Sequence, residues 1–401
     1  MPLFDPFRRS YLDNPYPSLA KLRREDPVHR SRELEGWVVT RHADAREVLR
    51  DNERFSNDPT TSTSGLGVHV AASRRRSPLG ETPLLGSSDP PVHTRLRGIV
   101  ARQFTPRVVE ESRPRARALI EELLDGGRVG DEIEFMGAVA QQLPVLIIGE
   151  LLGLEPDERG PLREWTRAVM RVIGGGELPP SAYREAEAAA AQLRAFLDEY
   201  RERRDGPPTV LSALVAAERE EERLSTEETV SLLTFLYMAG GGPTALMLGN
   251  ALLALLNHRE QWELLRERPE LARSAVVETL RWDSATHLLL RFATEELTLG
   301  RRTIGGGDTV FVNVCAAHRD PEVFEDPDRF DITRQTETGS ILAFGIGPHF
   351  CLGQPLALIQ GEELLLALVE RFPTASIARN GVDRLQELLL RGPGRLCLDL
   401  A

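Results

Sequence analysis

A cysteine enclosed by glycines, directly ahead of a helix, constrains this chain more than any other stretch. Residues 344–357 read Phe-Gly-Ile-Gly-Pro-His-Phe-Cys-Leu-Gly-Gln-Pro-Leu-Ala, and a strongly helical segment follows. Gly345, Gly347 and Gly353 lack side chains, so a flat ligand or another backbone can approach closely. Cys351 lies just before a helix N-terminus, where peptide dipoles favour a thiolate. A thiolate is the form of cysteine that binds a soft metal or haem iron.

The spacing around Cys351 outweighs the ordinary interpretation of a lone cysteine, which is a small buried hydrophobe. Phe-Gly-x-Gly-x-His-x-Cys-x-Gly is followed by Leu-Ala. This pattern resembles the haem-binding loop of the cytochrome P-450 family. By that resemblance Cys351 is the axial thiolate ligand, whose electron donation to the iron favours O–O cleavage. The resemblance also implies that Phe344 packs beside the ligand.

Charge and cysteine content exclude several classes of protein. A formal net charge of -12 over 401 residues argues against a nucleic-acid partner. Cys315, Cys351 and Cys397 give no disulfide framework and fit a reducing cytosol. The N-terminus lacks the apolar stretch of a signal peptide or membrane anchor. We therefore expect a cytoplasmic protein, and the absence of repeats and low-complexity linkers predicts one domain over residues 1–401.

One long apolar segment could be mistaken for a membrane span. Residues 230–256 are mostly apolar and long enough to cross a bilayer. Gly240, Gly241, Gly242 and Pro243 interrupt its centre, and the sequence offers no second candidate span. A helix that is apolar all round is also what a buried central helix looks like. We expect the core helix and no membrane.

The remaining pattern is mainly helical with short strands. A capping box at residues 225–228 opens the central helix. Residues 57–88, rich in Ser, Thr, Gly and Pro, predict a long loop of the kind that covers a site or is disordered. Periodicity predicts further helices over residues 14–25, 43–50, 181–204 and 269–281, and strands over residues 36–40, 288–307, 310–314 and the C-terminal 30 residues.

Further motifs extend the resemblance over essentially the whole chain. It implies a mainly α fold with small β-sheets, a single large triangular domain around a buried haem b. Glu278 and Arg281 match the family's Glu-x-x-Arg pair. With Arg329 they would form a buried ionic triad behind the haem, and the loss of one member would cost about 3–5 kcal/mol.

Four residues fall where the family places its partners for the two haem propionates. His93 and Arg97, at i and i+4, share one face of a helix and could bind a carboxylate on their own. The resemblance adds Arg291 and His349 to them. Each alone would pass as a surface charge, and together with the cysteine loop they predict the propionate edge of a haem site.

The centre of the long helix departs from the family pattern. The family usually carries Ala-Gly-x-(Asp/Glu)-Thr-Thr, whose acid and first threonine manage proton delivery to oxygen. Residues 239–244 read Ala-Gly-Gly-Gly-Pro-Thr. Gly242 stands at the acid position, Pro243 at the alcohol position, and only the second threonine, Thr244, is retained. Pro243 cannot donate to the carbonyl of Ala239 and predicts a kink; Ala239 and Gly240 are expected beside the haem.

Two interpretations of this departure stay open. One is a plain kink in an ordinary monooxygenase, with Thr244 or water as substitute. The other is that the protein proton relay is missing. Three mechanisms then remain: a substrate hydroxyl completes the relay, peroxide replaces oxygen and two electrons, or the enzyme performs oxidative coupling or ring closure. We favour the substrate-assisted, oxygen-dependent reaction on a small secondary metabolite.

Seven arginines between Arg95 and Arg117 suggest a partner. A basic run is often only a solvated helix face. On an acidic protein it can also form a patch that attracts an acidic protein. By the resemblance that partner is a ferredoxin, served by a ferredoxin reductase, and we expect the enzyme itself to be a monomer.

The substrate pocket is inferred from position in the resembling fold. Candidates on the central helix are Ala239 and Gly240, together with residues 62–85 and the turn near Gly174. His287, Leu288, Leu289 and Leu390 complete the set, and His287 could hold a polar substrate group. A function from another class also stays open: a haem-containing sensor or recruitment protein that no longer activates oxygen.

Overall fold

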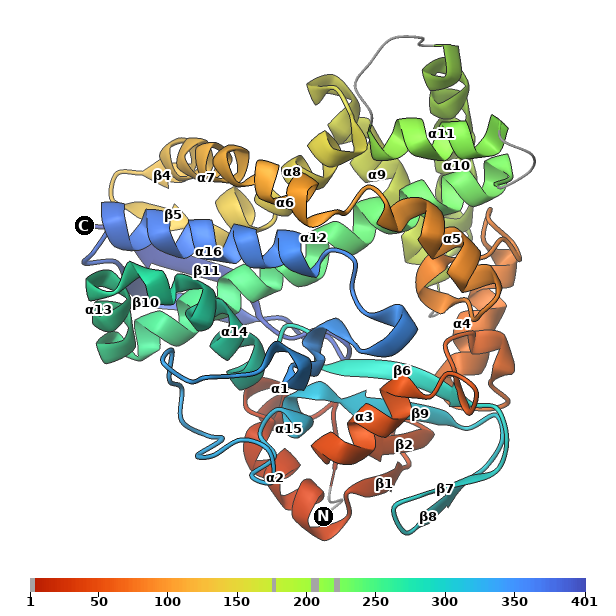
Figure 1. The fold of residues 1–401 in the computed structure, drawn as a ribbon, viewed down its shortest axis with the longest axis horizontal. Helices are drawn as coiled ribbons and strands as arrows, with labels where there is room; N and C mark the ends of the chain where they lie inside the picture. The colour runs from red at the N-terminus through yellow and green to blue at the C-terminus, as the bar shows by residue number, and fades with distance from the viewer. Residues whose placement is uncertain (1–3, 175–177, 203–208, 220–223) are drawn as a thin grey trace.

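The computed structural model describes residues 4–174, 178–202, 209–219 and 224–401 (Figure 1). The helices are α1 (Arg9–Asp13), α2 (Tyr16–Glu25), α3 (His42–Arg50), α4 (Gly65–Arg76), α5 (Val92–Ala101), α6 (Pro106–Glu111), α7 (Arg113–Gly127), α8 (Leu143–Leu152), α9 (Pro156–Ile173), α10 (Pro180–Glu202), α11 (Val210–Arg219), α12 (Thr226–Asn257), α13 (Arg259–Glu267), α14 (Ala272–Trp282), α15 (Val314–Ala317) and α16 (Gln354–Arg371). The strands are β1 (Val28–Ser31), β2 (Gly36–Val39), β3 (Phe55–Ser56), β4 (Arg128–Val129), β5 (Glu132–Glu134), β6 (Leu288–Ala293), β7 (Leu297–Leu299), β8 (Arg302–Ile304), β9 (Thr309–Asn313), β10 (Ser376–Arg384) and β11 (Pro393–Asp399).

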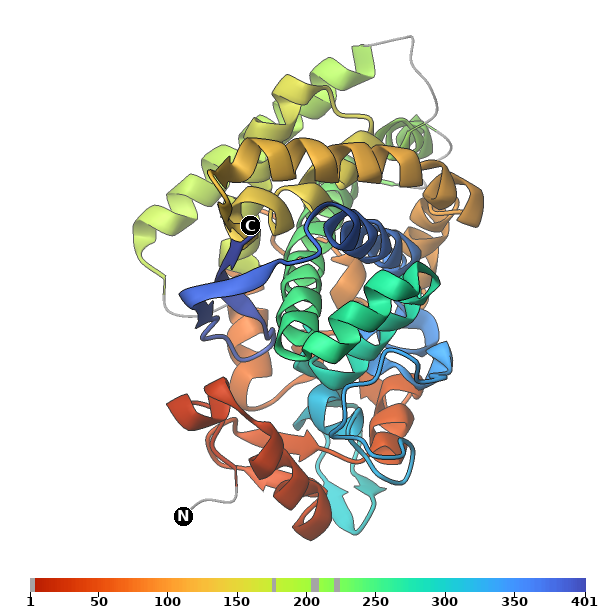
Figure 2. The same ribbon diagram turned by 90° about the vertical axis from the view of Figure 1, so that its left-hand side faces the viewer.

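The long helix α12 runs through the middle of the helical part of the molecule (Figures 1 and 2). It begins at the predicted capping box, in which the Ser225 hydroxyl accepts from the Glu228 amide at 3.2 Å and the Glu228 carboxylate accepts from the Ser225 amide at 3.0 Å. Helices α8, α9, α14 and α16 pack around it. By length and composition α12 could cross a bilayer, but 72% of its most apolar window is buried inside the protein. This placement agrees with the prediction of a core helix.

A sheet at the N-terminal end of the molecule carries one wall of the interior. Its strand order is β1-β2-β9-β6-β3, with β2 and β9 parallel and the other pairs antiparallel. In the β6–β9 register, Leu289 pairs with Val312 and Arg291 with Val310. Side chains two residues apart on a strand point to the same face. The side chains of Leu289 and Arg291 therefore lie on the same face of β6.

The C-terminal strands form a second sheet, of order β10-β11-β5-β4, with residues 128–134. An isolated bridge from Thr286 to Leu390 connects the segment before β6 to the loop between β10 and β11. The predicted strands at 36–40, 288–307, 310–314 and the C-terminus are confirmed, as are the helices over 43–50 and most of 14–25 and 269–281.

One expectation about local structure was wrong. Residues 57–88 are not one long loop, because α4 and two single 3₁₀ turns occupy much of it. The Arg74 side chain donates to the Thr82 carbonyl at 2.9 Å and so fixes the chain that follows the helix. Pro144 lies in the first turn of α8, where its missing N–H costs nothing. Part of the expected turn near Gly174 and the end of the predicted 181–204 helix lie outside the described residues.

Candidate active site

The cysteine loop is shaped by backbone geometry. A 3₁₀ turn at Leu342–Phe344 ends on Gly345, whose φ of 68° lies in the left-handed region, and Gly347 has a φ of 71°. The amide of Cys351 donates to the carbonyl of Phe344 at 2.9 Å, which closes the loop. Helix α16 then begins at Gln354. Residues other than glycine rarely adopt a positive φ, so the loop needs glycine at these two positions to keep its shape.

The pKa of the Cys351 thiol is set by burial and by neighbouring groups, which act in opposite directions. Burial raises its pKa, and the backbone N–H groups of Gly353 and Gln354 and the charge of Arg97 oppose that rise. Backbone N–H groups beside a sulfur favour its thiolate form. A metal cation bound to the sulfur would lower the pKa of the thiol and so favour the thiolate.

A cavity of about 400 Å³ opens above this sulfur. It is bounded by the cysteine loop and α16, by the middle of α12, by residues 285–291 and by α5. Most of the residues that line the cavity are apolar. They include Leu85, Phe104, Pro144, Ile148, Phe235, Leu236, Met247, Leu280, Ala285, Leu289, Phe344, Leu352 and Leu356.

The edge of this cavity holds the four predicted cationic side chains, His93, Arg97, Arg291 and His349. The rings of His93 and His349 lie 3.9 Å apart between centroids. Arg97 donates through Nη2 to the Phe350 carbonyl at 2.6 Å, and Arg291 is 4% exposed. None of the four forms an ion pair with another described residue.

Three polar atoms on this edge are buried and have no hydrogen-bond partner among the described residues: Nδ1 of His93, Nε of Arg291 and Nε2 of His349. Burial lowers the pKa of Arg291 to about 10, and burial followed by the charges of His93 and Arg291 lowers the pKa of His349 to about 3. Buried donors without acceptors cost free energy, which a bound anion would recover. The edge therefore fits the two carboxylates of a haem, and the soft thiolate donor fits its iron.

On the opposite wall, α12 continues without a break through Pro243. Ala239, Gly240, Pro243 and Thr244 line the cavity. Gly242 does not line it, is exposed, and would meet no atom within 4 Å if it carried a Cβ. The acid position of the resembling motif is thus open space beside the cavity, with no side chain in it.

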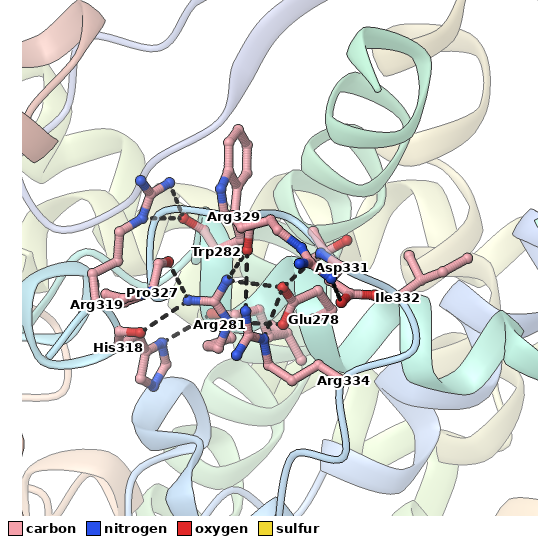
Figure 3. A network of polar contacts seen from close by, with 12 residues as sticks. Glu278, Arg281, Trp282, His318, Arg319, Pro327, Arg329, Asp331, Ile332 and Arg334 are labelled. Carbon is pink, nitrogen blue, oxygen red and sulfur yellow. Dashed lines mark hydrogen bonds and ion pairs between the residues drawn. The ribbon is translucent and has the colours of Figure 1, made fainter. Parts of the chain in front are cut away.

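Glu278 and Arg281 form the predicted buried pair at the end of α14 (Figure 3). The contact is bidentate, with Nε–Oε2 at 2.7 Å and Nη2–Oε1 at 2.8 Å, and the two side chains are 1% and 0% exposed. Arg281 also donates to the carbonyls of His318, Pro327 and Arg329. These bonds attach the irregular segment 318–334 to the helix.

The third member of the triad is Arg334, so the prediction of Arg329 was wrong. Nε of Arg334 lies 3.4 Å from Glu278 Oε1, with the side chain 15% exposed. The Arg329 side chain is 65% exposed and pairs with Asp331; only its backbone carbonyl joins the network. Figure 3 shows Arg334 beside Glu278 and Arg329 beside Asp331. Composition does not tell the two apart, because the fold of the segment decides which one turns inward. We call Glu278, Arg281 and Arg334 the Glu278 cluster.

The predicted substrate residues separate into two groups. Leu289, Ala239 and Gly240 line the cavity, as do Leu85 at the end of residues 62–85 and the following Gly86. His287, Leu288 and Leu390 do not. Nε2 of His287 lies 2.9 Å from the Tyr11 hydroxyl, the residue is 4% exposed, and burial lowers its pKa to about 3. His287 is therefore a neutral core residue and is not placed to hold a substrate group.

Several cavity residues were not predicted, among them Asn57, Phe235, Ile148 and Gln360. Phe235 and Ile148 look like any core residue in the sequence. Asn57 and Gln360 are 8% and 2% exposed, and each leaves one side-chain polar atom without a partner among the described residues. No spacing in the sequence marks them.

Five of the seven arginines between Arg95 and Arg117 are neutralised by glutamates. Arg113, for example, lies 2.7 Å from a Glu363 oxygen, and Arg115 lies 3.1 Å from Glu150. Arg102 is exposed and forms no ion pair in the described part of the chain. The basic run is therefore much less of a positive patch than the sequence suggests. The paired arginines are Arg95, Arg107, Arg113, Arg115 and Arg117.

A cysteine sulfur on the wall of a cavity, and an edge of basic side chains without ion pairs among the described residues, are the features of a haem–thiolate protein. The model of the family "Cytochrome P450" matches residues 179–397. Vitamin D(3) 25-hydroxylase of Pseudonocardia autotrophica is 36% identical, with 98% of this chain and 95% of that protein covered. Cytochrome P450 monooxygenase PikC of Streptomyces venezuelae is 38% identical over 92% of this chain and 86% of its own.

Solved structures agree with these relatives. The structure of cytochrome P450 enzyme CxnD, described as forming a C–S bond in chuangxinmycin biosynthesis, aligns with a TM-score of 0.87 at 30% identity, covering 98% of this chain and 96% of its own. The chain belongs to the cytochrome P450 family, whose members named here are haem-dependent oxidoreductases that act on small molecules. The predicted fold, mainly α with small β-sheets, is confirmed.

Proposed function

We propose that this protein is a haem b monooxygenase that oxidises a small, largely apolar secondary metabolite with O₂, using a proton relay that the substrate or water completes. The observation that carries the proposal is the Cys351 sulfur. It lies on the wall of a cavity of about 400 Å³, beside an edge whose basic side chains form no ion pair with another described residue. A haem bound there would supply the oxygen-activating iron chemistry that the protein side chains lack.

The residues of the site have distinct roles under this proposal. Cys351 would bind the haem iron, and Gly345 and Gly353 would leave room for the flat ring against the loop backbone. His93, Arg97, Arg291 and His349 hold the propionates by charge-assisted hydrogen bonds. Phe344 packs beside the sulfur and excludes water from it, which preserves the donor strength of the thiolate. The roles of these residues follow the family motif position by position.

On the substrate side, residues 239–244 provide room but no acid. Pro243 has no backbone N–H and no hydroxyl, and Gly242 has no side chain. Thr244 is the one side-chain hydroxyl of this stretch and is 9% exposed on the cavity wall. A substrate hydroxyl, or a water held by Thr244, would have to hold the proton that the usual acid and alcohol deliver.

An apolar substrate follows from the composition of the cavity. Most of its lining is Leu, Ile, Phe, Met and Ala, with Asn57, Thr244, Thr286 and Gln360 as the neutral polar exceptions. Such a site binds a hydrophobic skeleton and orients it through few polar groups. The names of several relatives refer to antibiotic or polyketide biosynthesis, which supports a secondary metabolite as substrate.

Oxidative coupling or ring closure is the second candidate reaction. The named activity of CxnD, C–S bond formation, shows that the family fold accommodates a coupling outcome in that protein. A peroxide-driven enzyme and a non-catalytic haem sensor or recruitment protein are further alternatives. Both would keep the Cys351 loop and tolerate the loss of the acid at residue 242.

The electron donor under this proposal is a ferredoxin with its reductase. Arg102, exposed and without an ion pair among described residues, and the face of α5 beside the cysteine loop offer the contact. The protein would work as a monomer in the cytoplasm. The net charge of -12 leaves nucleic acid excluded as a partner.

Two measurements test the proposal. The absorption spectrum of the reduced carbon monoxide complex should show the red-shifted band of thiolate ligation. Reconstitution with ferredoxin, reductase, NADPH and O₂ should then oxidise at least one member of a panel of apolar metabolites. A spectrum that shows the thiolate band, together with no turnover of any compound with either the ferredoxin system or peroxide, would favour the haem sensor. The absence of the thiolate band would contradict the haem site itself.

A further inference from the structure

Asp283, the residue that ends α14, is the centre of a second buried ionic group. Its side chain is bound by Arg391 Nε at 2.7 Å, by the Tyr16 hydroxyl at 2.6 Å and by Arg384 Nη1 at 3.3 Å. Asp283 is 3% exposed and Arg391 7% exposed. Burial acts to raise the pKa of Asp283, but the charges of Arg391 and Arg384 and the Tyr16 hydroxyl lower it to about 2. We call these four residues the Asp283 cluster.

The Asp283 cluster joins three distant parts of the chain. Arg391 donates through Nη1 to the carbonyl of Leu12 at 2.6 Å and through Nη2 to that of Asp13 at 3.2 Å. The Asn250 side chain, on α12, donates to the carbonyls of Asp283 at 2.9 Å and Arg391 at 3.0 Å. The N-terminal segment, the end of α14 and the loop after β10 are thus tied together, and α12 is attached to them.

The segment that follows Asp283 forms part of the cavity. Ala285, Thr286 and Leu289 line it, and we call these three residues the substrate wall. Backbone bonds couple this segment to the loop that carries Arg391: the Arg391 amide donates to the Ala285 carbonyl at 2.8 Å, and the His287 amide donates to the Leu389 carbonyl at 2.8 Å. A shift of Arg391 therefore moves the wall through two peptide groups.

A second contact braces the same segment from behind. The Tyr11 hydroxyl lies 2.9 Å from Nε2 of His287 and accepts from the Asn313 side chain at 3.3 Å. Tyr11 and His287 are each 4% exposed. His287, which faces away from the cavity, thus fixes the strand between the wall residues Thr286 and Leu289.

We propose that Asp283, Arg391 and Tyr16 are positioning residues that set the place of the substrate wall, and through it the affinity and orientation of an apolar ligand above the haem. None of the three lines the cavity or holds the haem in the proposed site. Small displacements of a binding wall change productive geometry steeply. This inference rests on the proposed haem site, because it assigns the cavity above Cys351 to the substrate.

The test uses two iron ligands that differ only in whether they reach the wall. Imidazole binds the ferric haem without a side group, whereas 4-phenylimidazole carries a ring into the cavity. Both dissociation constants are measured by spectral titration of the holoenzyme. The variants are Arg391→Met and Tyr16→Phe, and the second removes one hydroxyl and keeps the ring. Arg395→Met is the matched control, since Arg395 lies on the same hairpin and pairs with Asp383 at the surface.

The expected result is a selective loss. The dissociation constant of 4-phenylimidazole rises by about two- to thirtyfold in Arg391→Met, the range for changes transmitted through a packed network, and less in Tyr16→Phe. The constant for imidazole stays within about twofold in every variant, and Arg395→Met matches the wild type for both ligands.

Two other outcomes would be distinct. An unchanged ratio of the two constants in Tyr16→Phe, and in Arg391→Met if it folds, would overturn the positioning role while leaving the haem site intact. A wild-type protein that shows no spectral response to imidazole at all would overturn the proposed haem site. If Arg391→Met does not fold, Tyr16→Phe alone decides, because the loss of one hydroxyl leaves the Asp283–Arg391 pair in place.

Discussion

The two sides of the cavity are built in different ways. On the Cys351 side, the bond from the Cys351 amide to the Phe344 carbonyl closes the loop, and the Glu278 cluster attaches the preceding segment to α14. On the α12 side, Gly242 has open space where a Cβ would stand, and Ala239 is exposed to the cavity. One side is fixed to a single geometry by glycine backbone and buried charge. On the other side, residues 239–244 carry no acidic side chain, which leaves proton supply to the ligand or to water.

The C-terminal end of α14 contacts both sides of the cavity. Glu278 and Arg281 serve the segment that leads to the cysteine loop, and Asp283, two residues further on, holds the substrate wall. A single helix end thus connects both halves of the site. Substitutions on either side of residue 282 should therefore separate cofactor binding from ligand binding.

Replacement of Cys351 should have the largest effect. Cys351→Ala removes the proposed iron ligand, so we expect loss of the thiolate band in the reduced carbon monoxide spectrum and loss of all oxidation. Cys397→Ala, on β11, is the control and should leave both unchanged. A thiolate band that survives in Cys351→Ala would assign the ligand to another cysteine.

The Glu278 cluster should dominate stability. Glu278→Gln leaves Arg281 buried without its partner, so the free energy of unfolding should drop by about 3–5 kcal/mol, with haem lost in parallel. Arg334→Met should cost less, because Arg334 is 15% exposed and its contact to Glu278 is 3.4 Å.

Arg329→Ala is the matched comparison for Arg334→Met. We expect a change within about 0.5 kcal/mol, since the Arg329 side chain is 65% exposed. Denaturant unfolding and haem content measure both. A larger cost for Arg329→Ala than for Arg334→Met would contradict the assignment of the third member.

His318 should make the Cys351 side sensitive to acid. Its Nδ1 lies 3.0 Å from the Leu280 carbonyl, and its Nε2 accepts from the Leu342 amide at 2.7 Å, which requires the neutral ring. Burial, and after it the charge of His42, lowers its pKa to about 3. The ordinary pKa of a histidine is near 6.5. At a pH below that value, His318 binds a proton in the unfolded chain but not in the folded protein.

The free energy of unfolding should therefore decrease as the pH falls from about 6.5 to about 3, and His318 should contribute about 1.4 kcal/mol per pH unit. In His318→Gln the slope between pH 6 and 4 should be shallower by that amount. His69→Gln, on the exposed side of α4, should keep the wild-type slope. An identical slope in His318→Gln would mean that the folded protein protonates this ring.

The smallest expected effect concerns the electron donor. Arg102→Glu reverses an exposed charge without an ion pair among described residues, so the KM for ferredoxin should rise about threefold at low salt and much less at high salt. Arg107→Glu, whose partner Glu111 already neutralises it, should change KM less. Equal effects of the two would argue that the donor binds elsewhere.

The sequence predicted the Cys351 side far better than the substrate side. Residue types and their spacing marked the Cys351 loop, and the resemblance to the family motifs supplied the edge residues and the Glu278–Arg281 pair. The choice between Arg329 and Arg334 depends on how an irregular segment folds, and no periodicity records that. His287 was misassigned because a buried histidine and a cavity histidine have the same sequence signal.

Cavity residues such as Phe235 and Ile148 were not found for a related reason. Any apolar residue on α8 or α12 can face a cavity or another side chain, and only packing decides. The Asp283 cluster joins residues from 16 to 391, a separation that local patterns cannot bridge. The departure at residues 239–244 was visible in the sequence, because it replaces particular residue types.

The central claim is that the substrate side lacks a protein proton relay. The most direct test measures product formed per NADPH consumed for a substrate with a hydroxyl near the oxidised carbon and for its deoxy analogue. The wild type is compared with the double variant Gly242→Asp and Pro243→Thr, in which the new carboxyl enters open space. We predict that the deoxy analogue uncouples NADPH use from product in the wild type and that the double variant restores coupling. Equal coupling for both compounds in the wild type, unchanged in the double variant, would contradict the claim.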